Sequence, residues 1–104
     1  MTAHTRIELA PQLGIAQAAE LHRSLCATLV YTAVEVDGTR VEEVDTAILQ
    51  LLVSFWRTRQ EQEMPCSWSG VSEVLRRAAT LLGLTESLHF PDRERAGGGS
   101  GAID

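Results

Sequence analysis

The chain has 104 residues, a length that suits one domain rather than two. Hydrophobic residues make up 44% and charged residues 22% of the chain, as in globular proteins, which excludes disorder throughout. The formal net charge is −5, and every basic residue is an arginine. An acidic chain without a basic cluster is a poor candidate for nucleic-acid binding, so we interpret Arg57/Arg59 and Arg76/Arg77 as solvated helix faces.

The first eight residues lack the apolar core of a signal peptide. The longest apolar stretch, from Ile48 to Trp56, is far shorter than the roughly 20 residues that span a bilayer. We therefore expect a cytoplasmic protein that does not insert into a membrane. Cys26 and Cys66 show no CxxC spacing, and we expect both thiols to be free, buried and without a close histidine companion.

The first half of the chain predicts a strand, a helix and a second strand. Polar and apolar residues alternate from Arg6 to Ala10, the period of a half-buried strand, and Pro11 and Gly14 then mark a turn. A helix is expected from Ile15 to Leu29, because apolar residues recur there at spacings of three or four. The β-branched segment from Val30 to Asp37 predicts the second strand, which Gly38 ends.

The second half continues the alternation. A helix is expected from Thr46 to Glu61, and it must end there or soon after because Pro65 prevents its continuation past Met64. Cys66–Trp68 is read as a short strand. Cap residues in 69–72 then begin a third helix that runs to Leu82, where Gly83 suits a left-handed C-cap.

This order of elements predicts an α/β fold with a small mixed, largely parallel sheet flanked by helices. We place a single domain at residues 1–90. The remaining residues, 91–104, include a Gly-rich run and little to bury, so we expect a flexible tail.

An acidic residue and a hydroxyl lie where a loop becomes a helix. Asp45 is expected to accept hydrogen bonds from the free N–H groups of the first turn, and its charge suits the positive end of the helix dipole. Thr46 then begins the helix, and its exposed hydroxyl is a candidate for phosphorylation. The added negative charge beside Asp45 can break a protein interface without unfolding the domain.

The helix after Thr46 is apolar on more than one face. Such a helix is either buried on two sides or offers a surface to a partner, and a small domain has little with which to bury both sides. We therefore expect the partner-binding residues to be Asp45, Thr46, Ile48, Leu49 and Leu52.

Three segments carry a resemblance to a known family. They are Leu13-Gly14-Ile15 leading into 18–21, Val34–Asp37 followed by 44–52, and 72–75 through to Gly83-Leu84. Together, over roughly residues 6 to 88, they resemble the STAS domain family, in the compact subgroup of anti-sigma-factor antagonists and the STAS subunits of bacterial lipid ABC transporters.

The resemblance implies that Thr46 matches the family's phosphorylatable residue, and that the helix after it and the loop before it form the partner surface. The implied partner is an anti-sigma-factor-type Ser/Thr kinase or a chemotaxis or other signalling protein. The alternative is the ATPase of a lipid ABC transporter. Family members often carry Gly two residues after the hydroxyl residue, where this chain has Ile48, a side chain that would crowd an approaching kinase.

No motif indicates an enzyme. The chain lacks a GxSxG elbow, a P-loop and an HExxH motif, and without lysine it cannot form a Schiff base through one. His22 is interpreted as a surface residue rather than a phosphotransfer histidine, and His4 and His89 suggest no metal cluster. We expect no catalytic residue, no metal and no cofactor.

Overall fold

The computed structural model describes residues 3–91. Three parallel strands form the main sheet in the order β1 (His4–Glu8), β3 (Ala33–Gly38), β5 (Cys66–Val71). Two short strands, β2 (Gln12–Leu13) and β4 (Glu43–Val44), form a second parallel pair. Every strand pairing among the described residues is therefore parallel.

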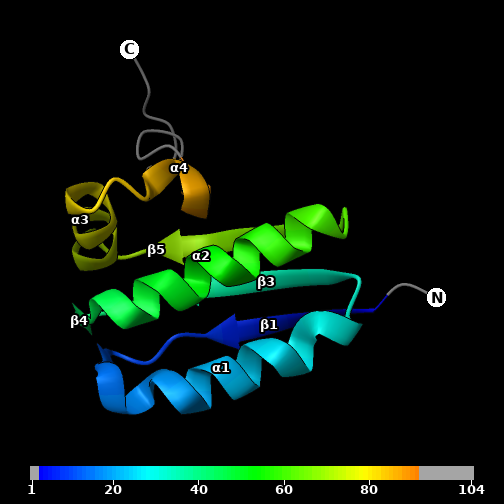
Figure 1. The fold of residues 1–104 in the computed structure, drawn as a ribbon, viewed down its shortest axis with the longest axis horizontal. Helices are drawn as coiled ribbons and strands as arrows, with labels where there is room; N and C mark the ends of the chain where they lie inside the picture. The colour runs from blue at the N-terminus through cyan, green and yellow to red at the C-terminus, as the bar shows by residue number, and fades with distance from the viewer. Residues whose placement is uncertain (1–2, 92–104) are drawn as a thin grey trace.

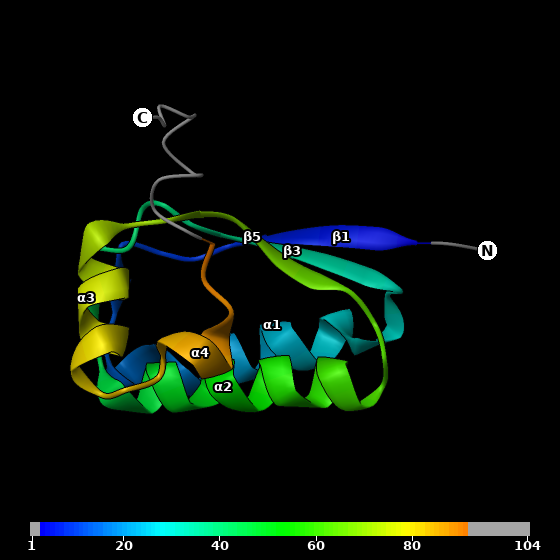
Figure 2. The same ribbon diagram turned by 90° about the horizontal axis from the view of Figure 1, so that it is seen from above.

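The helices lie on one side of this sheet. They are η1 (Ile15–Gln17), α1 (Ala18–Ala27), η2 (Thr28–Val30), α2 (Thr46–Glu61), α3 (Glu73–Leu81) and α4 (Thr85–Leu88). Helices α1 and α2 run along one face of the sheet, and α3 stands at one end of it (Figures 1 and 2). No described helix covers the opposite face (Figure 2). The predicted α/β fold class, a small and mostly parallel sheet flanked by helices, is confirmed.

Side-chain alternation explains why one face is covered and the other is open. In β3, Val34 and Val36 are buried against the helices, whereas Glu35 and Asp37 lie on the open face. Trp68 of β5 is buried on the covered face and stacks on Trp56 of α2, with ring centroids 4.6 Å apart. The sheet therefore contributes one apolar face to a two-layer core.

Helix ends follow their cap residues. Ser72 accepts a hydrogen bond from the Leu75 amide at 3.1 Å and begins α3. Gly83 has φ of +70°, the left-handed conformation expected after the helix, so this predicted C-cap is confirmed. Helix α4 was not expected, because four residues are too few to show a helical period.

Several expected boundaries differ from the structure. The first helix is divided, with 3-10 turns at both ends of α1, and β3 begins at Ala33 rather than at Val30. Strand β5 runs on to Val71, three residues past the predicted end, across an irregularity opposite Val36/Asp37. This extension was not predicted, because neither Ser69 nor Gly70 favours a strand. Of the expected tail, all but Pro91 lies outside the described residues.

Arg59 corrects the interpretation of the arginine pairs. Its side chain is fully buried, with 0% of the residue exposed, whereas Arg57 is exposed. Arg59 lies on the core-facing side of α2, eleven residues after the buried Ile48. Helical spacing therefore takes it into the core despite its charge.

Candidate functional site

The first turn of α2 is fixed by its cap. Asp45 has extended backbone angles, and its Oδ1 accepts a hydrogen bond from the amide of Ala47 at 2.8 Å. Its own amide donates to the carbonyl oxygen of Leu13 at 2.8 Å, which joins the cap to β2. The predicted N-cap is confirmed, and it holds the start of α2 at the end of the molecule where β4 lies (Figure 1).

Thr46 is the first residue of α2, and its side chain is exposed. At this position the free amides and the positive end of the helix dipole favour an added negative charge. The exposed carboxylates of Glu42, Glu43 and Asp45 lie on the segment immediately before it. A phosphoryl group on Thr46 would be compatible with the helix and would make this acidic end more negative. The assignment of Asp45 and Thr46 to a partner surface stays a prediction.

The three apolar residues expected on that surface lie elsewhere. Ile48 and Leu52 are 0% exposed and Leu49 is 1% exposed, so all three belong to the core. The expectation that they contact a partner directly has to be corrected. The sheet on one side and α1 and α4 beside it cover more of α2 than a small domain was expected to provide (Figures 1 and 2). These residues hold the helix in place beneath the candidate site.

A groove between α1 and α2 begins beside the start of α2. Its first part is shallow and largely open to solvent, with a volume of about 550 Å³, and is lined by Ala18, Ala19, His22, Ala47, Gln50, Leu51 and Ser54. A second hollow of about 200 Å³ shares His22, Leu51 and Ser54 with it and extends to Leu25, Cys26, Leu29, Phe55 and Thr58. No aspartate, glutamate or arginine lines either part. We call this surface the α1–α2 groove. Sequence reasoning missed it because its lining residues carry no motif.

An exposed apolar side chain adds to this end of the molecule. Ile15, the first residue of η1, is 64% exposed. It follows Leu13, whose strand pairs with β4 directly before Asp45. An accessible hydroxyl, an apolar side chain and a charge-free groove are thus available at one end of the helix layer.

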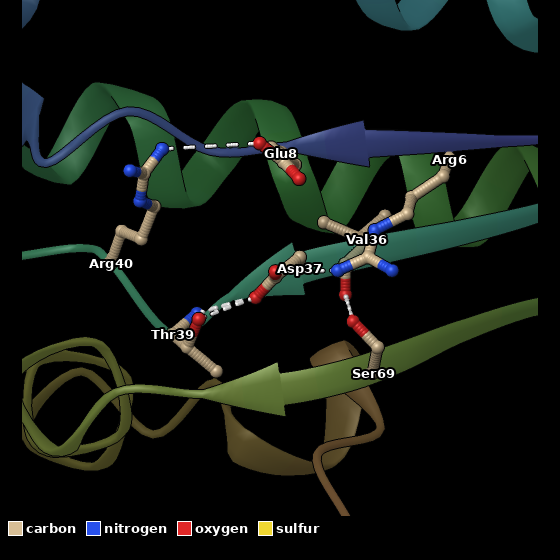
Figure 3. Close-up of polar contacts among 7 residues, drawn as sticks. All are labelled: Arg6, Glu8, Val36, Asp37, Thr39, Arg40 and Ser69. Atoms are coloured by element: carbon tan, nitrogen blue, oxygen red, sulfur yellow. Dashed lines mark hydrogen bonds and ion pairs between the residues drawn. The ribbon is translucent and has the colours of Figure 1, made fainter.

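The open face of the sheet carries a different group of polar side chains (Figure 3). Arg6 Nη2 lies 2.7 Å from Asp37 Oδ2, while the amide and hydroxyl of Thr39 donate to Asp37 Oδ1 at 2.9 and 2.7 Å. The Thr39 hydrogen bonds, with a smaller contribution from Arg6, hold the pKa of Asp37 below its ordinary value. Asp37 is therefore a carboxylate occupied in joining β1, β3 and the following turn, and not a candidate acid or base.

The two cysteines differ from expectation. Cys26 is exposed and Cys66 is half-buried, so the prediction that both are buried is wrong. Cys26 also has a close histidine companion, because Nε2 of His22 lies 3.6 Å from its Sγ. The spacing of four residues in a predicted helix was the signal that could have found this pair. His22 is exposed, which confirms its interpretation as a surface residue.

Within residues 3–91, no group of three or more His, Cys, Asp and Glu side chains is placed to hold a metal ion. In the same range, no helix is long and apolar enough to cross a membrane.

Comparison with known proteins assigns the chain to a family. The family model described as "Mlab, STAS domain" matches residues 2–90. No curated protein matches the chain. The chain therefore belongs to the STAS domain family, as the sequence resemblance indicated. STAS domains serve in general as regulatory or protein-interaction modules and are generally non-catalytic.

Proposed function

We propose that this STAS domain is a non-enzymatic switch module that binds a protein partner through the start of α2, with Thr46 as the regulated residue. It would act in a bacterial signalling complex in the manner of an anti-sigma-factor antagonist. The observation that carries the proposal is the exposed Thr46 side chain at a rigidly capped helix start, beside the uncharged α1–α2 groove.

The groove supports binding because it can be desolvated at little cost. Its lining has no formal charge unless His22 is protonated, so a partner that covers it buries few strongly hydrated groups. A phosphoryl group at the edge of this surface would have to be desolvated beside Asp45. Phosphorylation of Thr46 is therefore expected to weaken binding while leaving the fold intact.

The departure from the family pattern at Ile48 does not oppose this mechanism. Ile48 is 0% exposed, so its side chain lies in the core and does not crowd the approach to Thr46. A Ser/Thr kinase of the anti-sigma-factor type, or a chemotaxis or other signalling protein, is the partner class we propose.

The second candidate is an accessory STAS subunit that binds the ATPase of a lipid ABC transporter. The family match favours it as well, because the model described as "Mlab, STAS domain" covers residues 2–90 and the sequence resemblance includes the STAS subunits of such transporters. In that case Thr46 would serve as a neutral contact residue.

The proposal is tested by calorimetry with the purified product of a neighbouring kinase, signalling or ATPase gene. Thr46→Glu is expected to cost on the order of 1–3 kcal/mol of binding free energy, because the new charge is desolvated at the interface. Ser67→Glu is the matched control, because Ser67 is exposed on β5, whose buried Trp68 faces the helices. Equal affinity of wild type and Thr46→Glu would reject the site. Transfer of phosphate from ATP to wild type but not to Thr46→Ala would favour the signalling partner over the transport ATPase.

A further inference from the structure

Two metal-ligating side chains lie one helical turn apart in the α1–α2 groove. His22 and Cys26 are both exposed, and Cys26 Sγ lies 3.6 Å from His22 Nε2. Both side chains line the second hollow of the groove, and His22 also lines the first. The two donor atoms are therefore accessible to a solute and converge on one point of the surface.

Their separation matches that of two ligands on one zinc ion. With a Zn–S bond of about 2.3 Å and a Zn–N bond of about 2.0–2.1 Å, a tetrahedral angle puts sulfur and nitrogen about 3.5–3.6 Å apart. The observed distance is 3.6 Å, in a hydrogen bond between the two side chains, so an ion that replaced this hydrogen bond would have its two ligand atoms at the required separation. A spacing of four residues keeps both side chains on one face of the helix.

The surroundings set the number of ligands. One turn before His22 the helix has Ala18, and one turn after Cys26 the chain has Val30, so α1 supplies only these two donors. Ser54 and Thr58 across the hollow are poor zinc ligands, and no carboxylate lines it. Two coordination positions would face the open groove.

We propose that His22 and Cys26 form a bidentate site for a thiophilic divalent cation of the zinc class. The Cys26 thiol loses its proton to solvent as the sulfur binds the ion, and neutral His22 binds through Nε2. Water fills the two open positions in the isolated protein. An ion at this site would lie midway along the groove and would affect the binding of a partner there. The existence of the site does not depend on the proposed role of Thr46.

Cobalt(II), the spectroscopic substitute for zinc, is the probe. Titration of the reduced full-length protein should produce a thiolate-to-cobalt absorption band that saturates at one ion per chain. Cys26→Ser should abolish the band, and His22→Ala should weaken binding at least about tenfold, since even outer-shell changes at metal sites cost 10–100-fold. Both side chains are exposed, so circular dichroism should show that the variants keep the fold.

Two controls separate this site from non-specific binding. Cys66→Ala removes the other thiol, and His4→Ala removes an exposed histidine of β1, so both should leave the titration unchanged. Zinc should also protect Cys26 from alkylation in wild type and protect it poorly in His22→Ala. Absence of a thiolate band, or a band of equal affinity in His22→Ala, would overturn the proposal.

Discussion

Arg59 Nη1 donates a hydrogen bond of 2.8 Å to the carbonyl oxygen of Tyr31, which joins the last turn of α2 to the segment that enters β3. Its Nη2 donates to the carbonyl oxygen of Pro65 at 3.0 Å, just before β5. None of its described hydrogen bonds goes to a carboxylate, and its Nε is buried without a partner. The guanidinium is thus solvated by main-chain carbonyls at one end of the sheet. One of these is the carbonyl of Thr28, the C-cap of α1, where the negative end of the helix dipole suits a cation.

Replacement of Arg59 is therefore expected to destabilise the fold. Arg59→Ala removes the donors to Tyr31 and Pro65 and leaves a cavity in the core, which should lower the free energy of unfolding by about 3 kcal/mol. Urea denaturation followed by circular dichroism measures the change.

Arg57→Ala is the matched control, because Arg57 is exposed on the same helix two residues away. Its free energy of unfolding should stay within about 0.5 kcal/mol of wild type. If Arg59→Ala were as stable as Arg57→Ala, the main-chain hydrogen bonds of Arg59 would not contribute to stability.

Arg59 also shows what the sequence could predict. The spacing Ile48, Leu52, Phe55, Arg59 places this arginine on the buried side of α2, so its position was predictable although its charge argued for solvent. Main-chain carbonyls make the burial possible, and two of the three, those of Thr28 and Tyr31, lie about thirty residues away in the sequence. A single helix pattern carries no information about them.

The candidate site shows the same contrast between what local sequence rules predict and what depends on distant segments. Asp45 as the N-cap and Thr46 as an exposed first residue follow from local rules about helix ends, and the structure has both. The burial of Leu49 and Leu52 depends on elements that pack around α2, including the four-residue helix α4. Helix α4 is held in place by a hydrogen bond of 2.7 Å from Trp68 Nε1 to the carbonyl oxygen of Leu88. Long-range packing of this kind was not visible in the local pattern.

The start of α2 permits a test of capping. Asp45→Ala should cost about 1 kcal/mol of unfolding free energy, because the amide of Ala47 loses its acceptor. Ser72→Ala, which removes the corresponding cap of α3, should cost a similar amount, whereas Thr46→Ala should change little. Chemical denaturation of the three variants makes the comparison. If Thr46→Ala lost more unfolding free energy than Asp45→Ala, the assignment of the stabilising contact to Asp45 would be wrong.

The carboxyl of Asp37 should respond to Thr39. Since the folded-state pKa of Asp37 is lowered below its unfolded value of about 3.9, its contribution to stability is present above that pH and is lost as the pH falls through the folded-state pKa. Thr39→Ala should raise the pKa of Asp37 and reduce this acid-dependent part of stability. A carboxyl-detected NMR titration measures the pKa. Arg6→Ala should raise it less, and the reverse order would show that the ion pair is the stronger influence.

The two thiols should react at very different rates. Burial raises the pKa of Cys66 to about 12, against a weaker opposite effect of the Arg59 charge, whereas Cys26 is exposed. At pH 8 only roughly one in ten thousand Cys66 side chains would be thiolate in the folded state, so iodoacetamide in metal-free buffer should label Cys26 first. Labelling of Cys66 should increase as the pH rises toward 12, and it should become fast in urea at pH 8, where the pKa returns to its ordinary value. Peptide mass spectrometry of timed samples separates the two sites. Equal labelling of both cysteines in the native protein at pH 8 would show that β5 does not shield Cys66.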